Sequence, residues 1–122
     1  MPVRRVVTLV LLGLIGAFTG CGGSGGTVQT VTVTGTEMQF DPAELTLAPG
    51  RYRFRFVNAG QTFHDLGIYR NGQSRGIREA GAGQSIDLAV IKLETGTYTM
   101  ECHEPGHLQA GMRGTITVRK TP

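Results

Sequence analysis

The chain has 122 residues, which is the length of a single domain. Twelve lysine and arginine residues outnumber nine acidic residues, but Arg4 and Arg5 lie within the first five positions. The remainder carries ten basic and nine acidic side chains, and this balance excludes the strongly basic surface typical of proteins that bind nucleic acids.

The first 20 residues have the composition of a secretory signal. Residues 1–5 include two arginines, residues 6–18 are almost entirely apolar, and small residues immediately precede Cys21. An apolar stretch of about 13 residues is too short for a membrane-spanning helix, which needs roughly 20. We therefore expect residues 1–20 to be a signal peptide that directs the protein out of the cytoplasm.

The end of this segment resembles the cleavage box of bacterial lipoproteins, in which small residues such as Thr19 and Gly20 precede a cysteine. The resemblance implies that Cys21 becomes the lipidated first residue of the mature chain, anchoring it to the membrane. Lipoproteins prefer leucine where Phe18 stands, so an ordinary secreted protein cleaved nearby is the alternative. Residues 21–26 read CGGSGG, the composition of a flexible tether between the anchor and a domain at 27–122.

From Thr27 onward, apolar residues alternate with polar ones, as expected for strands with one buried face. Turn signals such as Pro49-Gly50 and Asn71-Gly72 separate the alternating stretches, which are clearest at 30–34, 51–56, 66–68, 86–90, 97–101 and 115–118. The pattern predicts an all-β, antiparallel sandwich or barrel of seven or eight strands. Residues 75–80 lack the alternation and could form a short helical turn.

The alternation also predicts where two reactive side chains point. His64 has the parity of Leu66 at the start of one predicted strand, and Cys102 has the parity of Met100 at the end of another. Both side chains should therefore face the interior from strand ends.

The run from Cys102 to Met112 reads CHEPGHLQAGM and indicates a metal site. It places a thiolate, the His107 imidazole and a thioether at intervals of five residues on one loop. Soft sulfur ligands together with imidazole favour copper over magnesium or calcium. A trigonal copper site needs one more imidazole, which His64 supplies.

Each of these residues has a simpler interpretation when taken alone. A single buried cysteine is usually a small hydrophobic residue, and Met112 and Met100 could both fill the core. Their combination favours a metal site, except for Met100, which we expect to pack in the core. His103 should point away from the site because it follows Cys102 directly, so a surface position is expected, with coupling to a second metal as the alternative.

The chain resembles the cupredoxins, small blue copper proteins of the plastocyanin and azurin kind. The resemblance spans Thr27 to Lys120 and includes MQFDP at 38–42, NAG at 58–60 ahead of His64-Asp65-Leu66, GTY at 96–98 leading to Cys102, and MRGT at 112–115. The Cys-x4-His-x4-Met spacing is similar to that of auracyanin, rusticyanin and sulfocyanin.

The resemblance implies a role for each residue of the site. Cys102 is the closely bound thiolate, His64 and His107 complete a trigonal plane, and Met112 is a distant axial ligand that tunes the reduction potential. Asp65 stands where many relatives have asparagine. It is expected to link the two ligand loops by accepting backbone N–H groups, and its charge to lower the potential.

The resemblance further implies a cupredoxin-like Greek-key β-sandwich that carries one copper per chain. The expected function is one-electron transfer outside the cytoplasm between membrane-bound donor and acceptor proteins. We expect a monomer that is not an enzyme, with storage or delivery of copper as the alternative function. Electrons would leave through the solvent edge of His107, with Pro105, Leu108 and Ala110 as the apolar docking patch. Arg51, Arg53 and Arg55 form a solvated strand face that could also dock an acidic redox partner.

The anchor is tested by replacing the cysteine that would carry the lipid. Cys21→Ser should release the protein from the membrane fraction and leave metal binding by the domain intact, because the only other cysteine is Cys102. Fractionation and mass spectrometry of the mature chain provide the measurement. A variant that stayed wholly in the membrane fraction would show that the apolar segment is an uncleaved anchor.

Overall fold

The structure, a computed structural model, describes residues 25–121. The predicted signal peptide, Cys21 and most of the predicted tether therefore lie outside the described residues. No helix in the described part is long and apolar enough to cross a membrane.

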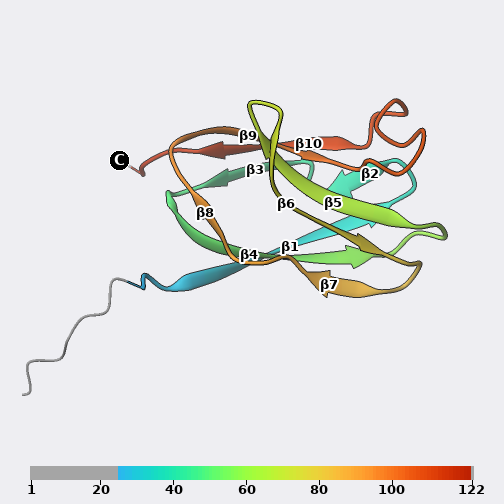
Figure 1. Cartoon of the computed structure of the whole chain (residues 1–122), viewed down its shortest axis with the longest axis horizontal. Helices are drawn as coiled ribbons and strands as arrows, with labels where there is room; N and C mark the ends of the chain where they lie inside the picture. The colour runs from blue at the N-terminus through green and yellow to red at the C-terminus, as the bar shows by residue number, and fades with distance from the viewer. Residues whose placement is uncertain (1–24, 122) are drawn as a thin grey trace, which may run out of the picture.

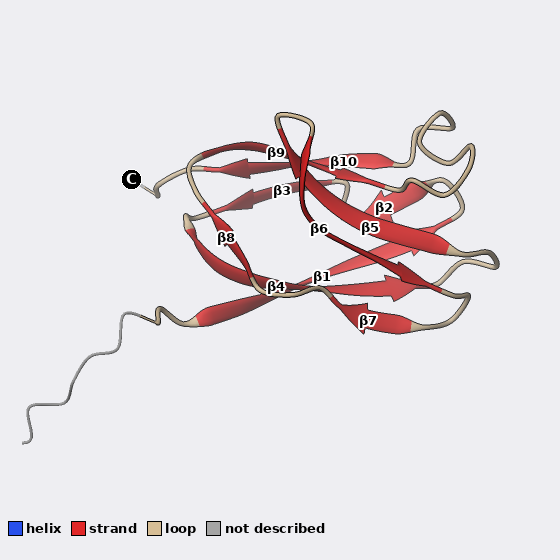
Figure 2. Cartoon of the chain, in the orientation of Figure 1, coloured by secondary structure: helices blue, strands red, loops and turns tan. Residues whose placement is uncertain are grey.

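Between residues 25 and 121 the chain forms ten strands in two facing sheets, shown in Figure 1 and, by type of structure, in Figure 2. The first sheet has the order β2-β1-β4-β7, with β8 paired to the beginning of β4. Its strands are β1 (Val28–Thr36), β2 (Gln39–Asp41), β4 (Gly50–Asn58), β7 (Ser85–Asp87) and β8 (Ile91–Leu93). The second has the order β3-β10-β9-β5-β6 and consists of β3 (Glu44–Leu47), β5 (His64–Arg70), β6 (Gln73–Ala80), β9 (Gly96–Glu101) and β10 (Arg113–Val118). The predicted all-β sandwich is confirmed.

Two details of the predicted architecture were wrong. The strand count exceeds the expected seven or eight partly because β2 and β8 have three residues each, too few to show an alternation. The alternating stretch predicted at 86–90 is also shorter than expected, since only 86–87 belong to β7 and residues 88–90 lie between β7 and β8. The sheets are mixed rather than antiparallel, because β1 pairs with β4 and β3 with β10 in parallel.

The predicted helical turn at 75–80 is also absent, since these residues belong to β6. This strand lies at the edge of its sheet and most of its side chains are exposed, so no buried face imposes an alternation on its sequence. It is joined to β5 by Asn71 and Gly72, whose positive φ angles of 52° and 73° suit a tight two-residue hairpin.

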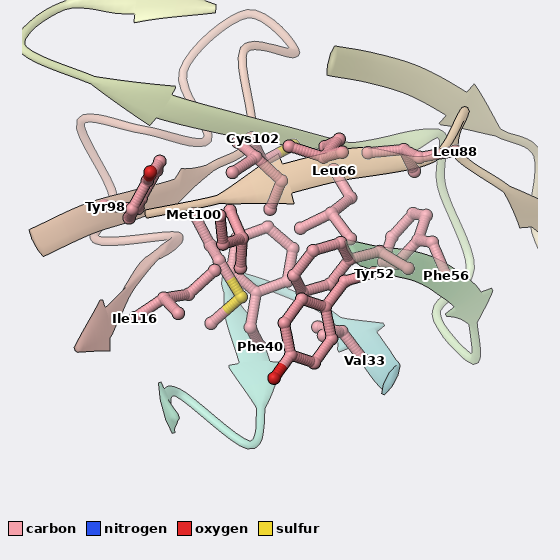
Figure 3. Close-up of a cluster of buried hydrophobic side chains, with 14 of the residues drawn as sticks. Val33, Phe40, Tyr52, Phe56, Leu66, Leu88, Tyr98, Met100, Cys102 and Ile116 are labelled. Carbon is pink, nitrogen blue, oxygen red and sulfur yellow. The ribbon is translucent and has the colours of Figure 1, made fainter. Parts of the chain in front are cut away.

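The core lies between the inner faces of the two sheets. On β4, Phe54 and Phe56 are fully buried, whereas Arg51, Arg53 and Arg55 face solvent as predicted. Figure 3 shows aromatic residues of the first sheet, including Phe40, Tyr52 and Phe56, packed against side chains of the second, including Leu66, Met100 and Ile116. The Phe40 and Phe56 rings meet edge to face, with centroids 6.1 Å apart. Met100 has no exposed surface, which confirms its predicted place in the core.

The topology brings three chain segments to one end of the sandwich. β5 begins at His64, β9 ends just before Cys102, and β10 begins just after Met112. Because β5 and β9 are antiparallel neighbours, the start of one lies beside the end of the other. In Figure 1 the loop from β9 to β10 and the loop that leads into β5 lie at the same end of the molecule.

Candidate metal centre

Three of the four predicted site residues form a compact group of donor atoms. Nδ1 of His64 lies 3.1 Å from Nδ1 of His107, and Sγ of Cys102 lies 3.5 Å from Nδ1 of His107 and 4.0 Å from Nδ1 of His64. A point equidistant from these atoms lies about 2.1 Å from each, close to the bond lengths by which imidazole and thiolate hold a first-row metal ion. The three side chains therefore fit one shared ion.

The inward orientation of His64 and Cys102 confirms the prediction from strand parity, since neither side chain has any exposed surface. His107 is half-buried and lies in the loop between β9 and β10. Of the three donor residues, only His107 therefore reaches the surface.

The Cys102 thiol is buried but has a hydrogen-bond donor beside it. Burial raises the pKa of this thiol, because the charged form loses its hydration. The backbone N–H of Asp65, 3.4 Å from Sγ, opposes this effect by donating to the sulfur. A metal ion must displace the thiol proton, so binding at neutral pH releases a proton.

Met112 lies in the interior at the end of the same loop. Its side chain has no exposed surface, and its backbone C=O accepts the N–H of Cys102 at 3.1 Å. Its own N–H donates to the C=O of His107 at 3.0 Å. A Cβ atom on Gly35 of β1 would lie 2.7 Å from the Phe56 ring and 3.3 Å from the terminal methyl of Met112, so glycine at this position leaves room for both side chains. The axial role of Met112 remains a prediction.

The ligand loop is folded by its own backbone hydrogen bonds. The N–H groups of His107 and Ala110 donate to the C=O groups of Glu104 and Gly106, each at 3.0 Å. Gly106 has a φ of 84°, a left-handed conformation that glycine adopts without steric cost. These turns fix His107 relative to Cys102.

Asp65 joins the two ligand-bearing segments, as predicted. Its two carboxylate oxygens accept the backbone N–H of His103 at 3.0 and 3.1 Å. Burial raises the pKa of the Asp65 carboxyl, and the His103 N–H counteracts part of that rise. The start of β5 is thus tied to the residue that follows Cys102.

His103 points away from the donor group, which confirms its predicted orientation. Its Nε2 atom lies 2.7 Å from a carboxylate oxygen of Glu101, and its ring stacks on Tyr69 with centroids 4.9 Å apart. Contact with His103 also helps to lower the pKa of Glu101, against the opposing effect of burial. In the structure His103 is thus a surface residue whose ring contacts Glu101 and Tyr69.

Two residues that support the site were not identified from the sequence. The buried Asn58 amide donates to the C=O groups of Thr62 and Ala80, each at 2.8 Å, and its oxygen accepts the N–H of Gly60. Glu37 accepts the N–H groups of Gln61 and Thr62, and the Gln61 hydrogen bond is the main cause of its lowered pKa. The turn motif at 58–60 was a signal for Asn58. The sequence held no such signal for Glu37, because the residues that it contacts lie 24 to 27 positions away along the chain.

The fold and the donor group together define a small β-sandwich protein with a metal centre of two imidazoles and one thiolate at one end. A family model of the cupredoxin-like domain matches residues 8–118. The chain therefore belongs to the cupredoxin-like family.

Solved structures of auracyanins share the fold. Dithionite-reduced auracyanin of Roseiflexus castenholzii is 20% identical with a TM-score of 0.68, over 75% of this chain and 97% of that one. Auracyanin B is 25% identical with a TM-score of 0.68, over 77% and 89% of the two chains. Auracyanin A, described as a blue copper protein of Chloroflexus aurantiacus, is 19% identical with a TM-score of 0.66, over 76% and 100%. No curated protein sequence is significantly similar to the chain.

The link made by Asp65 is tested by the stability of the metal-free protein. Asp65→Ala removes the acceptor of the His103 N–H and should lower the free energy of unfolding by roughly 1–3 kcal/mol. Asp65→Asn keeps one oxygen acceptor and should lose less. Urea titrations of the two variants provide the measurement, and equal losses would show that the hydrogen bond contributes nothing.

Proposed function

We propose that the centre holds one copper ion and that the protein transfers single electrons outside the cytoplasm. The observation that carries the proposal is the group formed by His64, Cys102 and His107, whose donor atoms surround one point at metal-bonding distance. Two imidazoles and one thiolate in a plane are typical of blue copper electron-transfer sites. The same fold occurs in auracyanin A, which is described as a blue copper protein.

Met112, the fourth residue of the predicted site, makes copper a better occupant than zinc. Imidazole and thiolate donors suit both metals, but a buried thioether in the same loop favours Cu(I). Met112 is fully buried and bonded through its backbone to both Cys102 and His107, so we assign it the axial position.

The bound copper would supply the Cu(I)/Cu(II) couple, and the protein would keep the ligand geometry constant. The links from Asp65 to His103 and from Met112 to Cys102 join the segments that carry the ligands. Close packing at this end leaves the buried ligands little freedom. A site that changes little between oxidation states favours rapid electron exchange.

His107 is the proposed exit for the electron, because it is the one donor residue that is not fully buried. Pro105 and Ala110 are exposed and Leu108 is half-buried in the same loop, which suits the predicted docking patch. Phe63, which directly precedes the donor His64, is also exposed, by 57%. A small apolar surface of this kind suits a short-lived encounter with a redox partner.

The thiolate is tested by Cys102→Ser. A serine hydroxyl is a harder ligand that ionises poorly, so the intense visible thiolate-to-Cu(II) band should vanish and Cu(II) affinity should fall, while the β-sheet circular dichroism remains. Visible spectra of the copper-loaded proteins, with voltammetry of the wild type, provide the measurement.

The matched control is His103→Ala, whose side chain faces Glu101 and Tyr69 and should leave the band nearly unchanged. A colour that survived Cys102→Ser would contradict the assignment, and a band lost in His103→Ala would favour a second metal. A wild-type site that transfers copper rapidly to an acceptor but shows no reversible electrochemistry would favour storage or delivery.

The axial position is tested by two substitutions of similar volume at Met112. Met112→Gln offers a harder carbonyl oxygen, which favours Cu(II) and should lower the midpoint potential. Met112→Leu offers no ligand and excludes water, which should raise it. Voltammetry should rank the potentials in the order Gln, Met, Leu. Equal potentials in the three proteins would show that Met112 only fills the core.

A further inference from the structure

The two nitrogens of the fully buried His64 ring face different partners. Nδ1 faces His107 and Cys102, and Nε2 lies 3.4 Å from a carboxylate oxygen of Glu37. The ring is therefore held between the donor group on one side and a carboxylate on the other.

Glu37 is held in this position by the loop that precedes His64. It lies in the turn between β1 and β2, and the same oxygen accepts the N–H groups of Gln61 at 2.6 Å and Thr62 at 3.3 Å. A backbone hydrogen bond from Ala59 to Gly35, 2.9 Å long, joins the same two segments. The Glu37 carboxylate thus joins the turn between β1 and β2 to the loop that precedes His64.

Gly60 lies beside the contact between the Glu37 carboxylate and the His64 imidazole, and its lack of a side chain leaves room for that contact. A Cβ atom at this position would lie 2.5 Å from the Glu37 oxygen and 2.9 Å from Nε2 of His64, closer than real Cβ atoms approach other groups. The Gly60 N–H donates to the buried Asn58 side chain, which holds the glycine in place.

We propose that Glu37 is a positioning residue for the copper ligand His64. Its carboxylate accepts the Nε2–H of His64, which leaves the lone pair of Nδ1 directed at the metal. A carboxylate partner also makes an imidazole a stronger donor, so Glu37 favours Cu(II) and lowers the reduction potential. This inference rests on the proposed copper function and adds a residue that sets the properties of the site.

The test is Glu37→Gln, which keeps the length of the side chain and an oxygen for the N–H groups of Gln61 and Thr62 but removes the negative charge. The matched control is Glu44→Gln. Glu44 is an exposed carboxylate at the start of β3 that pairs in register with Thr115, three residues after Met112. Unlike the carboxylate of Glu37, its carboxylate makes no hydrogen bond to His64. Voltammetry should show a higher midpoint potential in Glu37→Gln and a clearly smaller shift in Glu44→Gln. Equal shifts would show that only the overall charge matters and would overturn the proposal.

A second measurement does not depend on electron transfer. In the Cu(I) protein with ¹⁵N-labelled histidine, the Nε2–H proton of His64 should be protected from exchange and shifted downfield. It should move upfield in Glu37→Gln and exchange rapidly in Glu37→Ala. A signal unchanged in both variants would overturn the proposal. A wild-type protein without the intense visible band would overturn the copper function instead, and the zinc-loaded protein would then allow the same magnetic resonance test of the hydrogen bond.

Discussion

The antiparallel pairing of β5 with β9 is the constraint on which the metal centre depends. Gly67 lies opposite Glu101, so the first residue of β5 and the residue after β9 lie close together at the same end of the two strands. Side chains alternate between the two faces of a sheet, and in this register His64 and Cys102 both enter the interior. A slip of one residue in either strand would turn that donor toward solvent and separate the pair.

Strand pairing alone only brings the donor residues near one another. Hydrogen bonds at this end of the sandwich then fix the segments that carry them. Asp65 binds the backbone beyond Cys102, and Asn58 and Glu37 bind the loop that leads to His64. Most of these contacts use backbone groups on one side and a buried or half-buried side chain on the other. The metal ligands are thereby oriented by groups that do not themselves bind metal.

The sequence was enough to predict the orientation of the donor side chains, but not the residues and strand pairings that hold them in place. Leu66 and Ile68 on β5 and Tyr98 and Met100 on β9 set the parity of His64 and Cys102, so the inward direction of both donors follows from local pattern alone. The strands of three residues and the exposed edge strand β6 carry no such pattern, and the parallel pairing of β1 with β4 depends on contacts between distant segments. Glu37 was missed for the same reason, since only the folded chain brings it to His64.

The direction of β1 has a consequence for how the domain can be attached to a surface. Its nine residues span about 26 Å, from Val28 at one end of the sandwich to the turn with Glu37 beside His64 at the other. Figure 1 shows the start of β1 far from the loop between β9 and β10. A domain immobilised through residues before Val28, on an electrode for example, would present His107 to the solution on the opposite side. Direct electron exchange with such an electrode would then be slow, whereas soluble partners would reach the site without obstruction.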